Sequence, residues 1–384
     1  AGEGRDLVEG SCMACHDARL IERSLGYSAE DWKKLSSTMI YLDGAPELDA
    51  LAAYLAEHFP PDDKRAPVVV DGPLELSFES WSGPTRGQRA RDPVEAPDGS
   101  IWWTGQWADL VTRLDPETGA TREYDLPGGA RAHTVTAAED GTIWYTGNGN
   151  GTMGSLDPES GEITEYQMPD PAAGDPHSAI VAPDGRVYFT VQRGNRVGRV
   201  DPATGTVALV TMPVEGSRPY GIKRADDGTI WVSANGANRL YSIDPENLAV
   251  SEHEIPHEDS HARRLDIAPD GTIWYVNSGR GRIGHYDPVT STFREWQSPS
   301  GPGSHPYAIA WFDNAVWYNE SGMRPDMLVR FDPETERFQS WPIPSGDIHA
   351  GILRHMRTTR DGTGLLIHQS ATNDVMRVTV QPEG

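Results

Sequence analysis

Two cysteines and a histidine near the N-terminus carry the clearest chemical signal in the sequence. Cys12, Cys15 and His16 form the pattern Cys-Met-Ala-Cys-His, and the chain has no cysteine outside it. Two thiols one helical turn apart can reach the two vinyl groups of a haem, and the adjacent imidazole then lies under the iron. A zinc site would need two further ligands nearby, and a thioredoxin-like site would need a βαβ context. The spacing therefore predicts covalently attached haem c with His16 as an axial ligand.

The second axial ligand of the iron is predicted to be Met39, which precedes a predicted loop. A methionine thioether opposite histidine is the usual electron-transfer pairing and raises the reduction potential. Met13, His58 and an open coordination position are the alternatives. Met13 lies inside the attachment loop and cannot cross to the far face of the haem. His58 falls late in a predicted helix, at a position that favours the surface.

Residues 1–60 are predicted to form a small all-α cytochrome c domain that positions these ligands. Residues 2–9 lead into the cysteine pair, and segments 29–39 and 46–59 carry apolar residues at helical spacing. Ser28 stands before Ala-Glu-Asp, which is typical of an N-cap followed by acids in the first turn. Residues 61–73, which begin Pro-Asp-Asp-Lys-Arg, are predicted to be a linker.

The rest of the chain repeats itself about every 43 residues. Asp313-Asn314 replaces Asp-Gly in one unit, and the other six Asp-Gly pairs begin at Asp98, Asp140, Asp184, Asp227, Asp270 and Asp361. Repeats of this length with short strands and turn signals are typical of propeller blades. Seven units predict an all-β seven-bladed β-propeller over residues 74–384. The strand at 74–81 is predicted to complete the last blade, whose repeat has no outer strand.

The charge and the apolar pattern exclude two classes of partner. Fifty-seven acidic residues against 33 Lys and Arg give a net charge of −24, whereas nucleic acid needs a basic patch. No segment approaches the roughly 20 apolar residues that span a bilayer. We therefore predict no nucleic-acid partner and no membrane span. The abrupt start at Ala1, together with the haem motif, predicts a mature, exported (periplasmic) protein whose signal peptide has been removed.

The segment around the cysteine pair resembles the small cytochrome c domains attached to periplasmic dehydrogenases. The shared pattern is Cys-x-x-Cys-His followed by Arg, Trp, Met and a Tyr-Leu helix, and it is matched here by Arg23, Trp32, Met39, Tyr54 and Leu55. This resemblance implies that Met39 is the iron ligand and that the domain transfers electrons.

Residues 74–380 resemble the virginiamycin B lyase (streptogramin lyase) family of propellers. The resemblance rests on segments such as PHSAIVAPDGRVYFT at 176–190 and PYAIAWFDNAVWYNE at 306–320. The family uses two histidines and a glutamate with a divalent metal to remove a proton from the substrate and so catalyse an elimination reaction. Glu320 matches that glutamate, but Arg263 and Tyr307 occupy the two histidine positions, with His305 nearby. This departure implies that the family's elimination route lacks its base here.

One residue of each blade is expected to point into the central channel and to contribute to a polar ring. These residues are Arg91, His133, His177, Tyr220, Arg263, Tyr307 and Arg354. The arginines favour an anionic or carboxylate-bearing molecule, unless they pair with local acids. Histidines also gather at the expected mouth, and convergent histidines can bind copper, iron or another divalent ion. A possible second metal is therefore predicted at His177, His305 and His349; the alternative is that backbone or water satisfies each histidine.

Three functions are consistent with this sequence. The favoured one is a haem-c oxidoreductase whose channel oxidises a small substrate and whose haem passes electrons to a soluble cytochrome or cupredoxin, because a lyase has no use for a haem. Its predicted catalytic residues are His133, His177, Arg263, His305, Tyr307 and Glu320. The second is a metal-dependent lyase of the streptogramin type. The third is a non-catalytic electron-transfer or binding protein, since a propeller fold does not fix a function.

Overall fold

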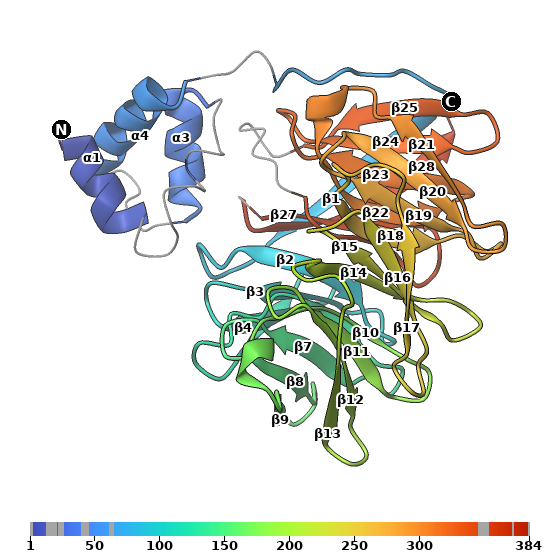
Figure 1. Cartoon of the computed structure of the whole chain (residues 1–384). Helices are drawn as coiled ribbons and strands as arrows, with labels where there is room; N and C mark the ends of the chain where they lie inside the picture. The colour runs from blue at the N-terminus through green and yellow to red at the C-terminus, as the bar shows by residue number, and fades with distance from the viewer. Residues whose placement is uncertain are drawn as a thin grey trace.

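The computed structural model describes residues 3–12, 21, 27–39, 46–60, 65–344, 353–370 and 372–382. Cys15 and His16, predicted for the haem site, and His349, predicted for the second metal, lie outside these ranges. Within them the strands form seven four-stranded antiparallel sheets arranged around a central axis (Figure 1). The predicted seven-bladed β-propeller is confirmed.

Each blade runs from an inner strand at the axis to an outer strand at the rim. Blades 1 and 2 consist of β2 (Ala90–Glu95), β3 (Ile101–Gly105), β4 (Leu110–Leu114), β5 (Thr121–Asp125), β6 (Val135–Ala137), β7 (Ile143–Gly147), β8 (Thr152–Leu156) and β9 (Ile163–Gln167). Blades 3 and 4 consist of β10 (Pro176–Val181), β11 (Val187–Val191), β12 (Arg196–Asp201), β13 (Thr206–Thr211), β14 (Pro219–Arg224), β15 (Ile230–Ala234), β16 (Arg239–Ile243) and β17 (Val250–Glu254).

The remaining blades follow the same order until the ring closes. Blades 5 and 6 consist of β18 (Ala262–Ile267), β19 (Ile273–Asn277), β20 (Arg282–Asp287), β21 (Thr292–Gln297), β22 (Pro306–Phe312), β23 (Ala315–Glu320), β24 (Met327–Asp332) and β25 (Arg337–Pro342). Blade 7 consists of β26 (Met356–Thr358), β27 (Gly364–Gln369), β28 (Asp374–Pro382) and β1 (Leu74–Ser82). Strand β1 pairs with β28 from Leu74 opposite Pro382 to Ser82 opposite Asp374, so the two ends of the propeller chain share one blade.

The repeated Asp-Gly pair builds the turn between the first two strands of a blade. Gly99 has φ +81°, which only glycine adopts without strain, and the Asp98 carboxylate accepts a 3.0 Å hydrogen bond from the Ser100 amide. The same aspartate-to-amide bond recurs at Asp140, Asp184, Asp227, Asp270 and Asp361. The second strand of each blade is buried along its length, which explains its run of apolar and aromatic residues.

Two features of the inner strands shape the channel. In five blades the pairing of the inner strand is irregular, for example between Arg91 and Val94 in β2. Two consecutive side chains can then face the axis, because a bulge interrupts the strict alternation of a strand. A polar side chain on or just after each second strand also donates to a carbonyl in or just before the next inner strand, at 2.5 to 3.4 Å; the donors are Thr104, Thr146, Thr190, Ser233, Ser278, Asn319 and Ser370.

Short helices precede the propeller in the described part of the chain. They are α1 (Glu3–Leu7), the π-helical turn η1 (Val8–Cys12), α3 (Ala29–Ser37) and α4 (Pro46–His58), and 3₁₀ turns at Pro171–Ala173 and Pro302–Ser304 lie within the propeller. The predicted N-cap is confirmed, since Ser28 and Asp31 form a reciprocal capping box at the start of α3. No helix in the described ranges is long and apolar enough to cross a membrane.

The helices pack on one another through an apolar cluster of their own, which includes Trp32, Leu35 and Leu51. Helix α1 crosses α4 at Gly4, where an added Cβ would lie 2.4 Å from Cβ of Tyr54. The two backbones can approach this closely only with glycine at that position.

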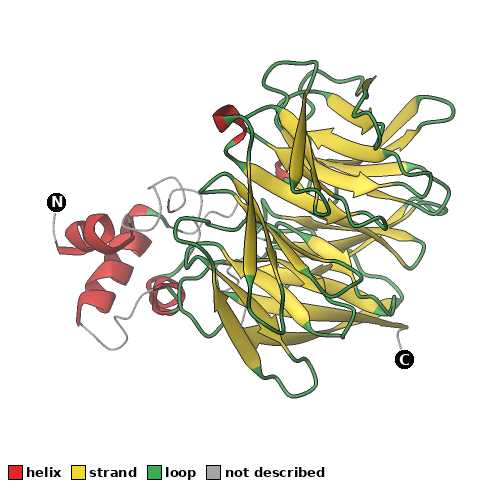
Figure 2. Ribbon diagram, turned by 90° about the horizontal axis from the view of Figure 1, so that it is seen from below, coloured by secondary structure: helices red, strands yellow, loops and turns green. Residues whose placement is uncertain are grey.

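The helices lie against one face of the propeller (Figures 1 and 2). The carbonyl of Thr38, just after α3, accepts hydrogen bonds from the Gly87 amide at 2.9 Å and from Nδ2 of Asn373 at 3.1 Å. Further along, the carbonyl of Arg65 accepts a 2.8 Å bond from the Arg324 amide. The segment that ends in Met39 is therefore held against the loops that precede β2 and β28.

Candidate active site in the propeller channel

Aromatic and guanidinium side chains from five blades meet at the axis. The rings of His133 and His177 have centroids 3.6 Å apart, and His177 lies 4.2 Å from Tyr220. The hydroxyl groups of Tyr220 and Tyr307 form a very short hydrogen bond. The guanidinium of Arg263 lies 4.3 Å from the centre of the Tyr307 ring and 5.5 Å from that of Tyr220. The channel therefore holds two imidazoles, two phenols and a cation in mutual contact.

The two imidazoles of this group are neutral. Burial lowers the pKa of His133 and of His177 well below the ordinary value, and nearby guanidinium groups add to the effect. Nδ1 of His133 lies 3.3 Å from the Thr134 hydroxyl, and Nδ1 of His177 lies 3.0 Å from that of Ser178. Within the described residues neither Nε2 atom has a hydrogen bond. Each Nε2 is thus available to a bound molecule.

The phenol pair carries one ionised oxygen near neutral pH. Burial alone would raise the pKa of Tyr307, but the charges of Arg263 and Arg354 outweigh burial and lower that pKa to about 7. Burial, followed by the neighbouring Tyr307, raises the pKa of Tyr220 to about 12. Tyr220 therefore remains the hydrogen-bond donor, and the Tyr307 oxygen can accept a proton from a bound molecule.

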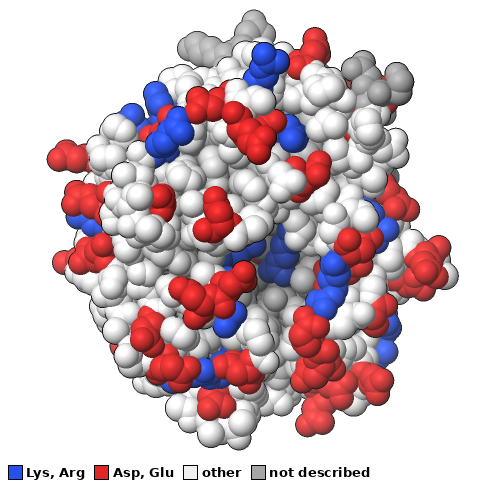
Figure 3. Space-filling view, turned by 90° about the vertical axis from the view of Figure 1, so that its right-hand side faces the viewer, with Lys and Arg blue, Asp and Glu red and all other residues white. Residues whose placement is uncertain are grey.

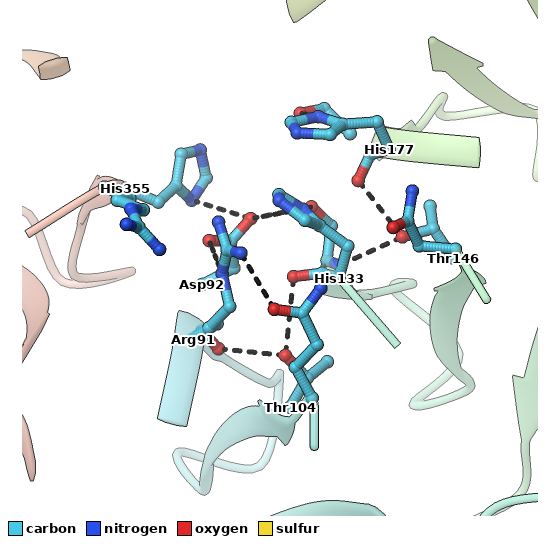
Figure 4. A network of polar contacts seen from close by, with 12 residues as sticks. Arg91, Asp92, Thr104, His133, Thr146, His177 and His355 are labelled. Carbon is cyan, nitrogen blue, oxygen red and sulfur yellow. Dashed lines mark hydrogen bonds and ion pairs between the residues drawn. The ribbon is translucent and has the colours of Figure 1, made fainter. Parts of the chain in front are cut away.

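The channel also contains a buried carboxylate, Asp92, which has φ +49° and lies beside His133 and His355 (Figure 4). Its Oδ2 accepts a 2.6 Å hydrogen bond from Thr134 and lies 3.5 Å from the guanidinium of Arg264. Nδ1 of His133 and Nδ1 of His355 lie 3.9 and 4.0 Å from the same oxygen. Although burial alone would raise the pKa of Asp92, these neighbours hold it well below its usual range. Asp92 is therefore ionised and compensates part of the positive charge.

One histidine in this layer has a structural role. Nε2 of His368 accepts the amide hydrogens of Arg354 and His355, both at 3.2 Å, so the proton of the neutral ring lies on Nδ1, beside Ser370. Burial lowers the pKa of His368 to about 3, which keeps the ring neutral. His368 thereby fixes the backbone that carries Arg354 into the channel.

A further arginine connects the channel to the helices. The amide of Arg89 donates to Oδ1 of Asn373 at 2.9 Å, and Nδ2 of the same asparagine donates to the Thr38 carbonyl. Burial lowers the pKa of Arg89 well below its ordinary value, and the neighbouring charge of Arg354 lowers it further. The charge of Arg89 thus interacts with that of Arg354 in the channel. The backbone of Arg89 is linked by hydrogen bonds, through Asn373, to the segment that ends in Met39.

The other predicted catalytic residues lie around this group. His305 occupies a left-handed turn before β22, with Nδ1 2.9 Å from the Ser321 hydroxyl and its ring 6.0 Å from Tyr307. Glu320 is fully buried at the end of β23, where its oxygens accept bonds from the Ser298 hydroxyl and from the amide and hydroxyl of Ser300. The structure therefore brings His305 close to Tyr307, whereas Glu320 forms its hydrogen bonds with these serines.

The described residues contain no cluster of three His, Cys, Asp or Glu side chains suited to a metal ion. His349, one of the three predicted ligands of a second metal, lies outside those residues, and the metal site remains a prediction. Three guanidinium groups, from Arg91, Arg263 and Arg264, lie near the imidazoles in the channel and disfavour a cation there.

The helical segment holds two of the residues predicted for haem. Cys12 and Met39, both partly buried, pack against the same apolar cluster. Inside that cluster Trp32 is 4% exposed, and its Nε1 has no hydrogen-bond partner among the described residues. A buried indole N–H normally donates to an acceptor. A thiol, a thioether and an unpaired buried donor around an apolar centre fit a haem, whose propionate would accept from Trp32.

Sequence reasoning found the ring but missed Asp92 and Arg264, each of which directly follows a ring residue. Strict alternation turns such neighbours away from the axis, whereas the irregular pairing lets both face it. The signal available in the sequence was two consecutive polar residues at the same repeat position in several blades. Arg89 was also missed, because its place depends on the distant Asn373.

Comparison with known proteins supports the fold. Virginiamycin B lyase from Staphylococcus aureus superimposes with a TM-score of 0.71 at 23% identity, covering 79% of this chain and 99% of that chain. Hydrazine synthase from Kuenenia stuttgartiensis gives a TM-score of 0.62 at 14% identity, covering 77% and 96%. At these identities the likeness concerns the fold alone. A search of curated proteins found no match. The profile of the virginiamycin B lyase family matches residues 76–381. The chain therefore belongs to the virginiamycin B lyase family.

Proposed function

We propose that this chain is an exported haem-c oxidoreductase whose propeller channel binds and oxidises a small anionic molecule. The observation that carries the proposal is the hydrogen-bonded link from the channel to the helices. Asn373 bonds both the Arg89 amide and the Thr38 carbonyl, and Thr38 precedes the predicted iron ligand Met39. A lyase or hydrolase would need no such connection between its site and a haem.

The residues that would hold haem are Cys12, Cys15, His16 and Met39, with Trp32 as the donor to a propionate. When bound, the haem would supply a one-electron acceptor that a soluble cytochrome or cupredoxin reoxidises. The chain's own contribution at that end is an apolar surround, formed by the cluster around Leu35 and Leu51, which excludes water.

The channel residues supply binding and proton transfer. Arg263 and Arg354 present positive charge beside Tyr307, which suits a carboxylate or another oxyanion of the substrate. The Nε2 atoms of His133 and His177 can hydrogen-bond the reacting group. The Tyr307 oxygen, ionised near pH 7, can take the proton released during oxidation. The preferred substrate is thus a small anion with an oxidisable O–H, N–H or C–H bond next to its charged group.

A second candidate function is a lyase that acts on an anionic substrate. Family membership and the Tyr307 phenolate favour it, because elimination needs a base and Tyr307 occupies one of the two histidine positions expected for this family. This reaction would leave the haem unchanged.

One experiment separates the two functions. Purified ferric holoprotein is mixed anaerobically with a panel of small carboxylates and other oxyanions, and both the visible spectrum of the haem and the products are recorded. The oxidoreductase predicts haem reduction that is lost in Arg263→Gln, with an oxidised product. Product formed by elimination with an unchanged haem spectrum would overturn the proposal in favour of the lyase.

A further inference from the structure

A second basic cavity lies at the end of the channel away from the helices. It has a volume of about 220 Å³, and its polar lining includes Thr136, Ser178, Lys223, Arg264, His355 and Arg357, which lie in or next to the inner strands. Figure 3 shows this face of the propeller, where Lys and Arg lie in a central hollow and patches of acidic residues are scattered over the surrounding surface. The concave shape and the concentrated positive charge make this hollow distinct from the rest of the face.

The three cations of this cavity differ in their contacts. Lys223 lies 2.9 Å from Asp266, and Arg264 lies 3.5 Å from Asp92. The guanidinium of Arg357, by contrast, has neither a hydrogen bond nor an ion pair within the described part of the chain. Burial lowers the pKa of Arg357 to about 10 although the charge of Asp92 acts in the opposite direction, so the side chain is charged at neutral pH and only partly compensated.

Other polar groups line the same cavity. Nδ1 of His355 is buried and has no hydrogen-bond partner among the described residues. The contacts of Arg264 with Ser178 and Asp92 are long, at 3.4 and 3.5 Å, so its guanidinium retains capacity for a closer acceptor. A partly buried cation and incompletely satisfied polar groups around a small cavity favour an acceptor that carries negative charge.

We propose that this cavity is a binding site for a small oxyanion, a carboxylate or a phosphate group, held chiefly by Arg357 and Arg264. It is separate from the proposed oxidation site, because neither Tyr307 nor Arg263 lines it. Asp92 adjoins this cavity through the lining residues Thr134, Arg264 and His355. The chain would therefore bind anions independently at the two ends of its channel.

The test is calorimetric titration of the holoprotein with inorganic phosphate, sulfate and citrate at low chloride. The wild type should bind at least one of these anions, with a component of the binding that Arg263→Gln leaves in place. Arg357→Gln should weaken that binding by about tenfold or more, which corresponds to loss of one charge-assisted hydrogen bond. Arg360→Gln, an equal charge change at an exposed position close in sequence, should alter the affinity less than twofold. A phosphate-only or a citrate-only response identifies the source of the oxyanion.

Two further measurements keep the outcome decisive. Arg263→Gln, which lies at the other end of the channel, should retain the binding that depends on Arg357. Lys223→Gln provides a second variant if Arg357→Gln does not fold, and it should weaken binding severalfold because it removes a positive charge from the lining. Equal affinity in wild type, Arg357→Gln and Lys223→Gln, or binding that disappears only in Arg263→Gln, would overturn the proposal.

Discussion

The ionisation of Tyr307 gives the sharpest quantitative prediction. The substitution Tyr307→Phe removes the phenol oxygen and leaves the ring beside Arg263 and Tyr220. An ordinary tyrosine titrates at about 10, so a pKa of about 7 means that the channel stabilises the phenolate by about 4 kcal/mol relative to water. Arg263 and Arg354 provide most of this stabilisation.

This shift makes the folding stability depend on pH in a defined direction. The folded pKa lies below the unfolded one, so the contribution is complete above about pH 10, falls as the pH drops, and vanishes below about pH 7. Between these limits the free energy of unfolding of the wild type, relative to that of Tyr307→Phe, should rise by about 1.4 kcal/mol for each unit of increasing pH. Urea unfolding of both proteins at several pH values measures this difference.

The ionisation itself can be observed by ¹³C NMR of protein labelled at the tyrosine ring. Among the 13 tyrosines one resonance should titrate near pH 7, and it should be absent from Tyr307→Phe. Tyr220→Phe removes the hydrogen bond to the phenolate and should raise the remaining pKa by about one to two. A wild-type spectrum in which no tyrosine titrates below pH 9 would refute the electrostatic reasoning for the channel.

Three further substitutions test separate parts of the structure. Gly87→Ala, at φ +65° and with its new Cβ 2.7 Å from the Met39 carbonyl, should weaken docking of the helices by at least about 1 kcal/mol, measured as faster hydrogen exchange in α3. Asp92→Asn leaves Arg264 without its carboxylate and should lower the free energy of unfolding by about 3–5 kcal/mol in denaturant titrations. Glu320→Gln should lower it by about 1–3 kcal/mol while substrate-dependent haem reduction persists; lost reduction at unchanged stability would instead make Glu320 catalytic.

The propeller was predictable because its determinants are local and repeated. Each Asp-Gly turn needs only a carboxylate acceptor and a residue tolerant of positive φ, and both are visible in the sequence at Asp98-Gly99 and its equivalents. The blade number followed from counting such turns. The ring from Arg91 to Arg354 was also predictable, because equivalent positions in a repeat occupy equivalent heights around the axis.

The rest of the site depends on contacts that no local pattern encodes. The inward turn of Asp92 and Arg264 follows from irregular strand pairing, which strict alternation does not anticipate. The link between Arg89 and Thr38 requires Asn373, which lies almost 300 residues further along the chain. The hydrogen bonds of Glu320 with two serines likewise depend on the approach of a loop to a strand end.

The central claim is that electrons pass from the channel to the haem within one chain. Rapid mixing of ferric holoprotein with an oxidisable anion, at a series of protein concentrations and saturating anion, measures this directly. The account predicts a haem-reduction rate constant that is independent of protein concentration and slower in Gly87→Ala. A rate constant proportional to protein concentration and unchanged in that variant, or no reduction by any anion bound in the channel, would contradict it.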